Sequence, residues 1–498
     1  MTAKHSVPVR GLSTTASSPL FQGRFGRMFR MEPATFGKTD TDAQNALAKL
    51  AKAMTSSPDD PKDGRDDEES GIPALYTYFG QFIDHDLTFD PNSSLQKRND
   101  PDALTDYRTP AFDLDCIYGR GPDDQPYLYD GSNGFLLGNP IHGANDPDAH
   151  DLPRNGAPVK RALIGDPRND ENTIVSQLQG LFHRFHNAML KRHPDAEFSD
   201  LQRIVRHYYQ YIVLYDFLPR IVDHGVLDQL KTGGRYDQSK LKYFHWKNEP
   251  FMPVEFSVAG YRLGHSMIRP GYRLNDGVLL PIFPSGQNKE GLTGFREMNP
   301  AWAIDWGRFI DIDTRDYDGD DAVKAKRLQF AYRIDTALVN PLANLPPAVA
   351  SNPSVLAERN LLRGWRLGLP SGQDIAYAMG VQPLNDEEIL IGQGVDKPDT
   401  PLPNILSVDP VFRKNCPLWT YILAEAMHHA VKVKIPVKSD VEVTTPRLGP
   451  VGGRIVAEVF VGLMFGDNSS ILNMNKNWFP GSGPNFALKD LVRIALGK

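Results

Sequence analysis

Residues 80–90, GQFIDHDLTFD, place one histidine between two aspartates and four residues after a glutamine. These side chains could form a metal site, an acid–base site or a solvated helix face. Successive helical residues turn by about 100°, so Gln81 and His85 share a face. Asp84 and Asp86 then point about 160° apart and cannot serve one small site together. One carboxylate can join Gln81 and His85 at a pocket, whereas the other faces a different partner.

Apolar neighbours argue against a solvated face, because they wrap this predicted helix: Phe79, Phe82, Ile83 and Leu87. A buried aspartate needs a partner. The segment RTPAFDLDCIYG (108–119) offers Thr109, Asp113 and Asp115 at alternating positions. Hard oxygen ligands from such a loop, with backbone carbonyls, suit Ca²⁺. Alone the loop is an ordinary Asp-rich turn, but together with Asp86 it predicts a calcium site.

Two further segments carry polar residues that could do chemistry. GYRLGHSMIRP (260–270) puts His265 on a mostly apolar predicted helix, where it is either a satisfied core histidine or a ligand. LIGDPRNDENT (163–173) supplies Arg168 and Glu171 in a polar loop before a helix, and its alternative interpretation is an N-terminal capping region.

Composition sets the outer bounds. The chain has 498 residues, 40% of them apolar, and a net charge of −6, which gives no reason to expect nucleic acid as a partner. Its two cysteines, Cys116 and Cys416, exclude a disulfide scaffold. The N-terminus has no apolar core of a secretory signal, and residues 455–465 are too short to span a bilayer. We therefore expect a soluble protein, cytoplasmic or non-classically secreted.

Hydrophobic periodicity predicts mainly helices around these segments. The expected helices are 42–54, 71–90, 176–193, 201–222, 255–268, 325–339 and 418–431. Residues 91–170 are rich in Pro, Gly, Asn and Asp and should form long loops, and alternating strand patterns are scarce. The prediction is a mainly α fold: residues 1–70 as an N-terminal extension with a short helix and an acidic loop, and 71–498 as a single large catalytic domain with few short strands.

Six segments occur together in the order seen in one family. The chain resembles the animal-type haem peroxidases of the peroxidase–cyclooxygenase superfamily, specifically their shorter bacterial members. The segments are GRFGRMF (23–29), RTPAFDLD, GDPRNDE, EFSVAGYRLGHSMIRP, RNLLRGWRLGLPSGQ (359–373) and RLGPVGGRIVAEV (447–459). Any one of them is a weak signal, but six in order cover most of the chain and are highly specific.

The resemblance implies a role for each matching residue. The distal side of haem b would have Gln81, His85 and Arg168; the proximal side would have His265 as iron ligand, Asn360 accepting from its other ring nitrogen, and Arg262 and Arg363 near the propionates. Asp84 and Glu171 match the carboxylates that form ester bonds to haem methyl groups. Calcium would be held by Asp86, Thr109, Asp113 and Asp115, with the carbonyl of Ala111 as a further ligand.

The implied activity is reduction of H₂O₂ through a ferryl intermediate, with His85 as general base and then acid. Iodide, bromide, thiocyanate or small aromatic donors would be oxidised. Asn172 stands where the best-known leukocyte enzyme has a methionine bonded to a haem vinyl group, so chloride oxidation is not expected.

Two other functions remain open at this stage. A fatty-acid dioxygenase of the cyclooxygenase kind would need a tyrosine three residues before the proximal histidine, where this chain has Arg262; Tyr261 lies one residue earlier. A calcium-stabilised adhesion protein would not need the distal residues. His183 and His186 could be metal ligands one turn apart, but a helix surface is the preferred interpretation for them.

Overall fold

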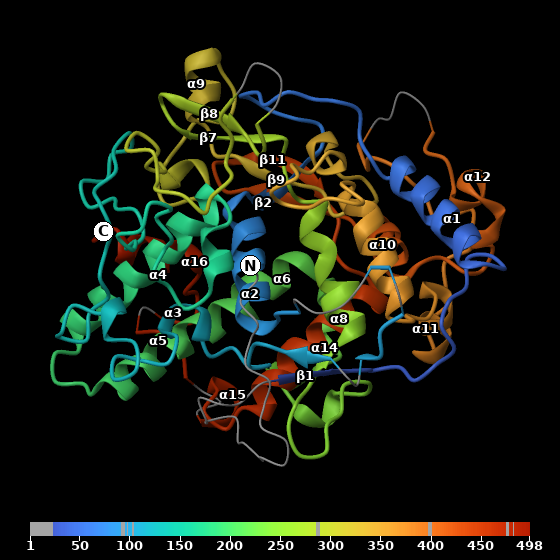
Figure 1. Cartoon of the computed structure of the whole chain (residues 1–498), viewed down its shortest axis with the longest axis horizontal. Coiled ribbons are helices and arrows are strands. Elements are labelled where there is room, and N and C mark those ends of the chain that lie inside the picture. The colour runs from blue at the N-terminus through green and yellow to red at the C-terminus, as the bar shows by residue number, and fades with distance from the viewer. Residues whose placement is uncertain are drawn as a thin grey trace.

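The computed structural model describes residues 23–90, 95–96, 98–101, 104–284, 289–396, 401–474, 478–481 and 483–498. Within them the fold is mainly α, as predicted, with short strands between the helices (Figure 1). The helices longer than ten residues are α1 (Asp40–Ala53), α2 (Leu75–Leu87), α4 (Thr173–Arg192), α5 (Phe198–Ile212), α10 (Leu356–Arg366), α13 (Leu418–His428) and α14 (Pro450–Gly466).

Shorter elements connect these helices. The short helices are α3 (Asp115–Tyr118), α6 (Leu218–Ile221), α7 (His224–Asp228), α8 (Val254–Val258), α9 (Asp321–Lys326), α11 (Gly372–Ala378), α12 (Ile405–Val408), α15 (Ile471–Met474) and α16 (Leu488–Ala495). The paired strands are β1 (Gly23–Gly26) between β3 (Thr105–Asp106) and β6 (Met252–Pro253), then β2 (Glu69–Pro73) with β9 (Phe330–Tyr332), β4 (Lys231–Thr232) with β5 (Arg235–Tyr236), β7 (Gly271–Asn275) with β8 (Val278–Pro281), and β10 (Val431–Ile435) with β11 (Lys438–Thr445).

Helices α2 and α4 form the centre of the core and lie side by side (Figure 1). Their aromatic side chains join them: the rings of Phe82 and Phe182 stack with centroids 4.5 Å apart, and Tyr209 of α5 meets both edge-on. Helix α4 begins at a defined point because the Asn172 side chain accepts hydrogen bonds from the first-turn N–H groups of Ile174 and Val175. This packing fixes the helix that carries the histidine–aspartate cluster.

The segment expected to be one helix over 255–268 is two elements. Helix α8 ends at Val258, and after Ala259 residues Gly260–His265 form a tighter 3₁₀ helix, η6. Gly260 sits so close to α14 that a Cβ there would be 3.0 Å from Ile455 Cγ2. The close approach favours glycine, and the tighter winding changes the direction in which His265 projects.

Three other expectations need correction. Residues 325–339 contain strand β9 rather than a helix: residues 328–332 are buried on every side, and such a run has no period that separates strand from helix. The alternating segment VKVKI (431–435), where no strand was expected, forms β10 of a hairpin with β11. The helix expected over 201–222 has a π-helical turn at Val213–Phe217, just before Pro219, which has no N–H for the helical pattern.

The boundary expected between residues 70 and 71 falls inside strand β2. Leu47 and Leu50 of α1 are fully buried, and α1 packs against α10, so the part of residues 1–70 that the structure describes belongs to the same core. Helix α2 likewise begins at Leu75 rather than at residue 71, because β2 occupies the preceding positions.

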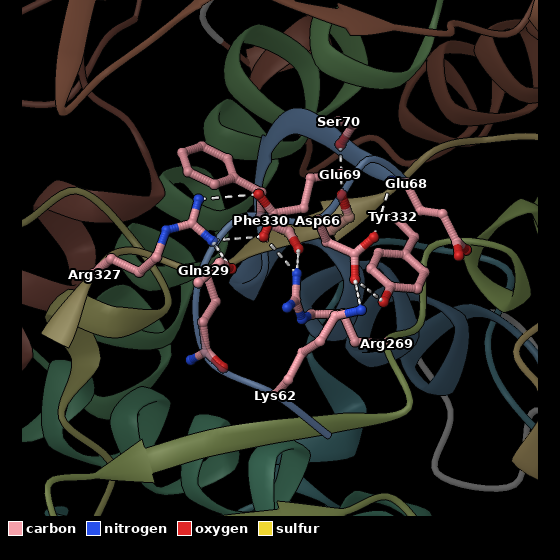
Figure 2. A network of polar contacts seen from close by, with 12 residues as sticks. Lys62, Asp66, Glu68, Glu69, Ser70, Arg269, Arg327, Gln329, Phe330 and Tyr332 are labelled. Atoms are coloured by element: carbon pink, nitrogen blue, oxygen red, sulfur yellow. Dashed lines mark hydrogen bonds and ion pairs between the residues drawn. The ribbon is translucent and has the colours of Figure 1, made fainter. Parts of the chain in front are cut away.

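Strand β2 is held by buried ion pairs as well as by its ladder with β9. Glu69 is 2% exposed and accepts from Arg269 at 2.7 Å and from Arg327 at 2.8 and 2.9 Å (Figure 2). We call Glu69, Arg269 and Arg327 the Glu69 network.

No helix in the described part of the chain combines the length and the apolar character needed to cross a bilayer.

Candidate active site

A cavity of about 630 Å³ is lined by α2, η6 and α10, together with the loop before α4. A space of this size suits a cofactor or a small molecule. The cavity brings together all nine residues that the sequence assigned to the haem side: Gln81, Asp84, His85, Arg168, Glu171, Arg262, His265, Asn360 and Arg363. These residues are spread over 283 positions of the chain, from 81 to 363, so only the tertiary fold makes them neighbours.

His85 is buried and has a defined hydrogen-bond partner. Its Nδ1 lies 2.7 Å from Oδ1 of Asn169, an oxygen that can only accept, so Nδ1 carries the proton. In the neutral ring Nε2 is then unprotonated, and it lies 3.5 Å from a carboxylate oxygen of Glu171. This is the arrangement of a general base whose free nitrogen is available at the cavity.

Gln81 shares that wall of the cavity. Its side-chain nitrogen donates a short hydrogen bond to Glu171, and its oxygen accepts from Asn172 at 3.1 Å. Asp84 is half-buried and lines the same cavity, while Asp86 on the other side of α2 is fully buried. The two aspartates therefore face different surroundings, as the helical spacing predicts.

Arg168 is held in place by Asp166, two residues earlier. Its Nε and Nη2 donate to Asp166, with Nη2 at 2.7 Å, and Nη2 also donates to the backbone oxygen of His85 at 3.0 Å. Arg108 contacts the same carboxylate at 2.6 Å. Burial alone would raise the pKa of Asp166, but the Arg168 and Arg108 charges outweigh burial and hold it below its ordinary value. Asp166 is thus an ionised anchor for Arg168.

His265, from η6, is the second histidine of the cavity. Burial, and then the nearby Arg262 charge, lowers the pKa of His265 to about 3, so the ring is neutral and able to bind a metal. The side-chain amide of Asn360 meets Nδ1 at 2.8 Å, but with its nitrogen rather than the expected oxygen toward the ring. A half-turn of the amide exchanges the two atoms, and metal binding at Nε2 requires it because Nδ1 then carries the proton.

Three arginines line the cavity near η6 and α10: Arg262, Arg359 and Arg363. Burial, and then the Arg262 charge, lowers the pKa of Arg363 to about 10, and Arg363 reaches Asp90 at 3.4 Å. Repulsion between these arginine charges favours binding of an anionic ligand, and the two propionates of haem are such anions. Arg359 was not among the predicted site residues.

Asp86, Asp113 and Asp115 bring ligand oxygens within 4.8 Å of one another. One oxygen of Asp86 and one of Asp115 are buried without a hydrogen-bond partner. Burial raises the pKa of all three, that of Asp113 to about 7, and the charge of Asp115 contributes to the rise at Asp86 and Asp113. Thr109 hydrogen bonds to Asp113 and lowers its pKa, so its hydroxyl is also close. A hard cation fits this set of oxygens.

The loop between these ligands is strained. Leu114 adopts φ 56 and ψ 36, a left-handed conformation that costs a leucine roughly 1–2 kcal/mol. It turns the chain so that Asp113 and Asp115 flank the cluster, and its own N–H donates to Asp86 at 3.3 Å. The backbone N–H of Ala111 donates to the backbone oxygen of Thr109 at 2.8 Å, which holds this part of the loop together.

Comparison with known proteins agrees with this geometry. The animal haem peroxidase family model matches residues 95–291, which include the aspartate loop, Arg168 and His265. Over these residues the chain is similar to the animal haem peroxidase family. That family implies haem as cofactor, and the cavity with its two histidines and four arginines fits that group.

Individual relatives are distant. Dual oxidase 1 of Caenorhabditis elegans is 25% identical over 309 residues, which are 57% of this chain and 19% of that protein. The chain spans less than a fifth of the length of the curated relatives it matches.

Solved structures show the same fold. Peroxidase A from Dictyostelium discoideum is 14% identical with a TM-score of 0.60, and the match covers 96% of this chain and 93% of that one. A fatty acid alpha-dioxygenase from Oryza sativa is 16% identical with a TM-score of 0.53, covering 93% and 80%. At such low identity these two structures support the fold alone.

Proposed function

We propose that this protein is a haem peroxidase that reduces H₂O₂ and oxidises small anionic or aromatic donors. The observation that carries the proposal is the convergence of His85, Gln81 and Arg168 with His265 on one cavity. A bound haem held through His265 would supply the iron that binds and activates peroxide.

The chain's own residues provide the proton chemistry. Nε2 of His85 takes a proton from hydrogen peroxide and returns it to the departing oxygen. Arg168, fixed by Asp166, stabilises the negative charge that develops as the oxygen–oxygen bond breaks. The hydrogen bond between Gln81 and Glu171 keeps both side chains at the same wall.

Among anionic donors we propose iodide, bromide or thiocyanate rather than chloride. Asn172 caps α4 and donates to Gln81, and an amide cannot form a sulfonium bond to haem. Without that bond the haem loses one means of reaching the high potential that chloride oxidation needs. Turnover with each halide and with a phenol, at equal concentration, separates these donors.

We also propose that Asp84 and Glu171 form ester bonds to haem, since both line the cavity and neither is deeply buried. Treatment with H₂O₂ should raise the fraction of haem that survives acid–organic extraction. Asp84→Ala and Glu171→Ala should each remove one bond, and the double variant should release all its haem. Complete extraction of wild-type haem after repeated peroxide exposure would show that no ester forms.

Calcium is the cation we propose for Asp86, Thr109, Asp113 and Asp115, with the Ala111 carbonyl as a further ligand. The oxygen-only set and the two unpartnered buried carboxylate oxygens support this choice. Through α2 the ion would fix the helix that carries His85.

The absorption spectrum of the purified protein, before and after H₂O₂, tests the main proposal. We expect a Soret band that changes on addition of peroxide, and His265→Ala should lose stable haem or activity. A His265→Ala variant with an unchanged Soret band and unchanged turnover would contradict the assignment of the ligand and of the cavity.

A haem fatty-acid dioxygenase is the second candidate function. Apolar side chains line part of the cavity, Phe283, Leu342, Leu345 and Leu356 among them, and the ring of Tyr261 lies at the cavity as well. Arg262 at the position of the radical-forming tyrosine argues against it. Oxygen uptake in the presence of a long-chain fatty acid, without peroxide, would favour this alternative over the peroxidase.

A further inference from the structure

Three buried side chains lie behind His85 and continue its hydrogen bond away from the cavity. Asn169 donates from Nδ2 to Oε1 of Gln179 at 2.7 Å, and Nε2 of Gln179 lies 2.9 Å from Nε2 of His183. Asn169 and Gln179 are fully buried, and His183 is 2% exposed. We call His85, Asn169, Gln179 and His183 the distal chain.

The orientation of the Gln179 side-chain amide is fixed by a neighbouring backbone oxygen. Nε2 of Gln179 also donates to the backbone oxygen of Cys116 at 3.4 Å, and a carbonyl oxygen can only accept. The nitrogen of Gln179 must therefore point toward Cys116 and His183, which turns its oxygen toward Asn169. The Asn169 nitrogen then faces Gln179 and its oxygen faces His85. Each amide can be satisfied in only one orientation.

From this polarity we infer that Asn169 and Gln179 are positioning residues that hold His85 in the Nδ1–H tautomer and leave Nε2 as the base. Peroxide chemistry at this site needs Nε2 unprotonated, and the opposite tautomer would present an N–H to the oxygen that must lose a proton. The inference deepens the proposed peroxidase function and rests on it for the kinetic test alone.

His183 ends the distal chain as an acceptor. It is stacked on Phe135 with ring centroids 4.4 Å apart, and burial, followed by the neighbouring His186, lowers its pKa to about 3. A neutral His183 keeps a lone pair on Nε2 for the Gln179 N–H. Sequence reasoning assigned His183 to a helix surface, but α4 buries this face against the loop that contains Phe135.

The same carbonyl ties the distal chain to the aspartate loop. Cys116 follows Asp115, and its oxygen also accepts from the backbone N–H of Asp166 at 3.1 Å. The loop that would bind calcium thus supports both the tautomer of His85 and the carboxylate that anchors Arg168. Three charged groups from outside α2 interact with His85: Glu171, Arg168 and Asp166. Asp84 and Asp86 flank His85 on α2 itself.

The direct test is ¹⁵N NMR of histidine-labelled protein with haem bound, reduced and saturated with carbon monoxide so that it is diamagnetic. In the wild type, His85 should show a protonated Nδ1 and an unprotonated Nε2. Asn169→Leu and Gln179→Leu should give a mixture of tautomers or the reverse one. Gln177→Leu is the matched control. It removes another buried side-chain amide of α4, one that bonds to the backbone of Trp302 and Ile304.

Kinetics give a second measurement. Asn169→Leu should slow the reaction with H₂O₂ by about 10-fold to 10²-fold, less than loss of the base itself. Asn169→Asp keeps an acceptor for Nδ1–H, so it should retain the tautomer, and the acid limb of its rate–pH profile should move to higher pH because a carboxylate stabilises the imidazolium.

An unchanged His85 tautomer in both leucine variants would overturn the inference even if peroxidase activity is found. Conversely, the expected tautomers without any reaction with peroxide would refute the proposed function and leave the positioning role intact. Loss of the tautomer in Gln177→Leu as well would show that any cavity in α4 has this effect, and would also overturn the assignment.

Discussion

Two buried polar regions flank α2, and they differ in how their charges are balanced. In the Glu69 network one carboxylate meets two guanidinium groups, and both of its oxygens are bonded (Figure 2). In the aspartate cluster three carboxylates crowd together, and Asp115 forms an ion pair with Arg108 at 3.2 Å. The Glu69 network has more N–H donors than carboxylate oxygens, whereas the aspartate cluster has more carboxylate oxygens than donors.

The contrast separates a structural network from a candidate cation site. A paired carboxylate inside the protein needs nothing more, and removal of either partner leaves an uncompensated charge. A surplus of buried acceptors needs a cation or protons from outside. The distal residues form a third case. Nδ1 of His85 bonds to Asn169, on the side away from the cavity, whereas Nε2 of His85 faces the cavity, where a substrate could meet it.

Replacement of His85 should produce the largest effect on activity and a small one on stability. His85→Ala should keep haem but react with H₂O₂ about 10²–10⁴-fold more slowly, since it removes general acid–base catalysis. Stopped-flow measurement of the peroxide reaction checks this. A rate within about twofold of wild type would give His85 a structural role only.

Replacement of Glu69 should have a large effect on stability and a small one on activity. Glu69→Gln leaves the Arg269 and Arg327 charges buried without their carboxylate, and we expect a loss of about 3–5 kcal/mol in unfolding free energy with normal kinetics per folded molecule. Denaturant unfolding measures it. Lys49→Met, which removes the exposed pair with Asp409, is the control and should cost about 0–1 kcal/mol. Equal losses in the two variants would mean that burial of the Glu69 network contributes nothing special.

The sign of the stability change at Asp113 distinguishes a cation site from a bare acidic cluster. If Ca²⁺ is bound, Asp113→Asn should lower calcium-dependent stability by about 1–3 kcal/mol. If nothing is bound, the same change relieves repulsion and should raise the melting temperature. Melting curves with calcium and with a chelator decide between the two results, and metal analysis should give about one ion per chain.

The smallest expected effect is a pH dependence at the edge of the Glu69 network. Burial, and then the charges of Asp66 and Asp335, raises the pKa of Glu68 to about 8 from an ordinary 4.5. The folded protein therefore keeps a proton that the unfolded chain has lost, so this contribution to stability is present below pH 4.5 and disappears as pH rises to about 8.

Glu68→Gln should remove that dependence and gain about 1–2 kcal/mol over wild type at pH 8, after allowance for partial solvent screening. Melting temperatures at pH 5 and pH 8 measure the difference. Glu387→Gln, at an exposed position, should change neither value. A constant gap between Glu68→Gln and wild type at the two pH values would contradict the proton uptake.

Local spacing was enough to predict several features of this protein. The 3.6-residue period separated Asp84 from Asp86, and it predicted α1, which has an apolar stripe of buried residues opposite a polar face. Six ordered motifs indicated the family, and the resemblance assigned nine of the residues that line the cavity. These are properties of short segments, so they can be read without knowledge of what packs against them.

The tertiary structure alone decided which polar atoms meet across the fold. Strand β9 was misassigned because a run buried on both faces loses its period, and the break at Ala259 depends on the close contact of Gly260 with α14. Asn169 and Asp166 lie in a motif that the sequence singled out, yet their roles depend on His85 and Arg108, 84 and 58 positions away in the chain. Hydrogen bonds between distant residues have no period along the chain, so only the packed molecule shows that His85 meets Asn169 and that the three aspartates gather in one cluster.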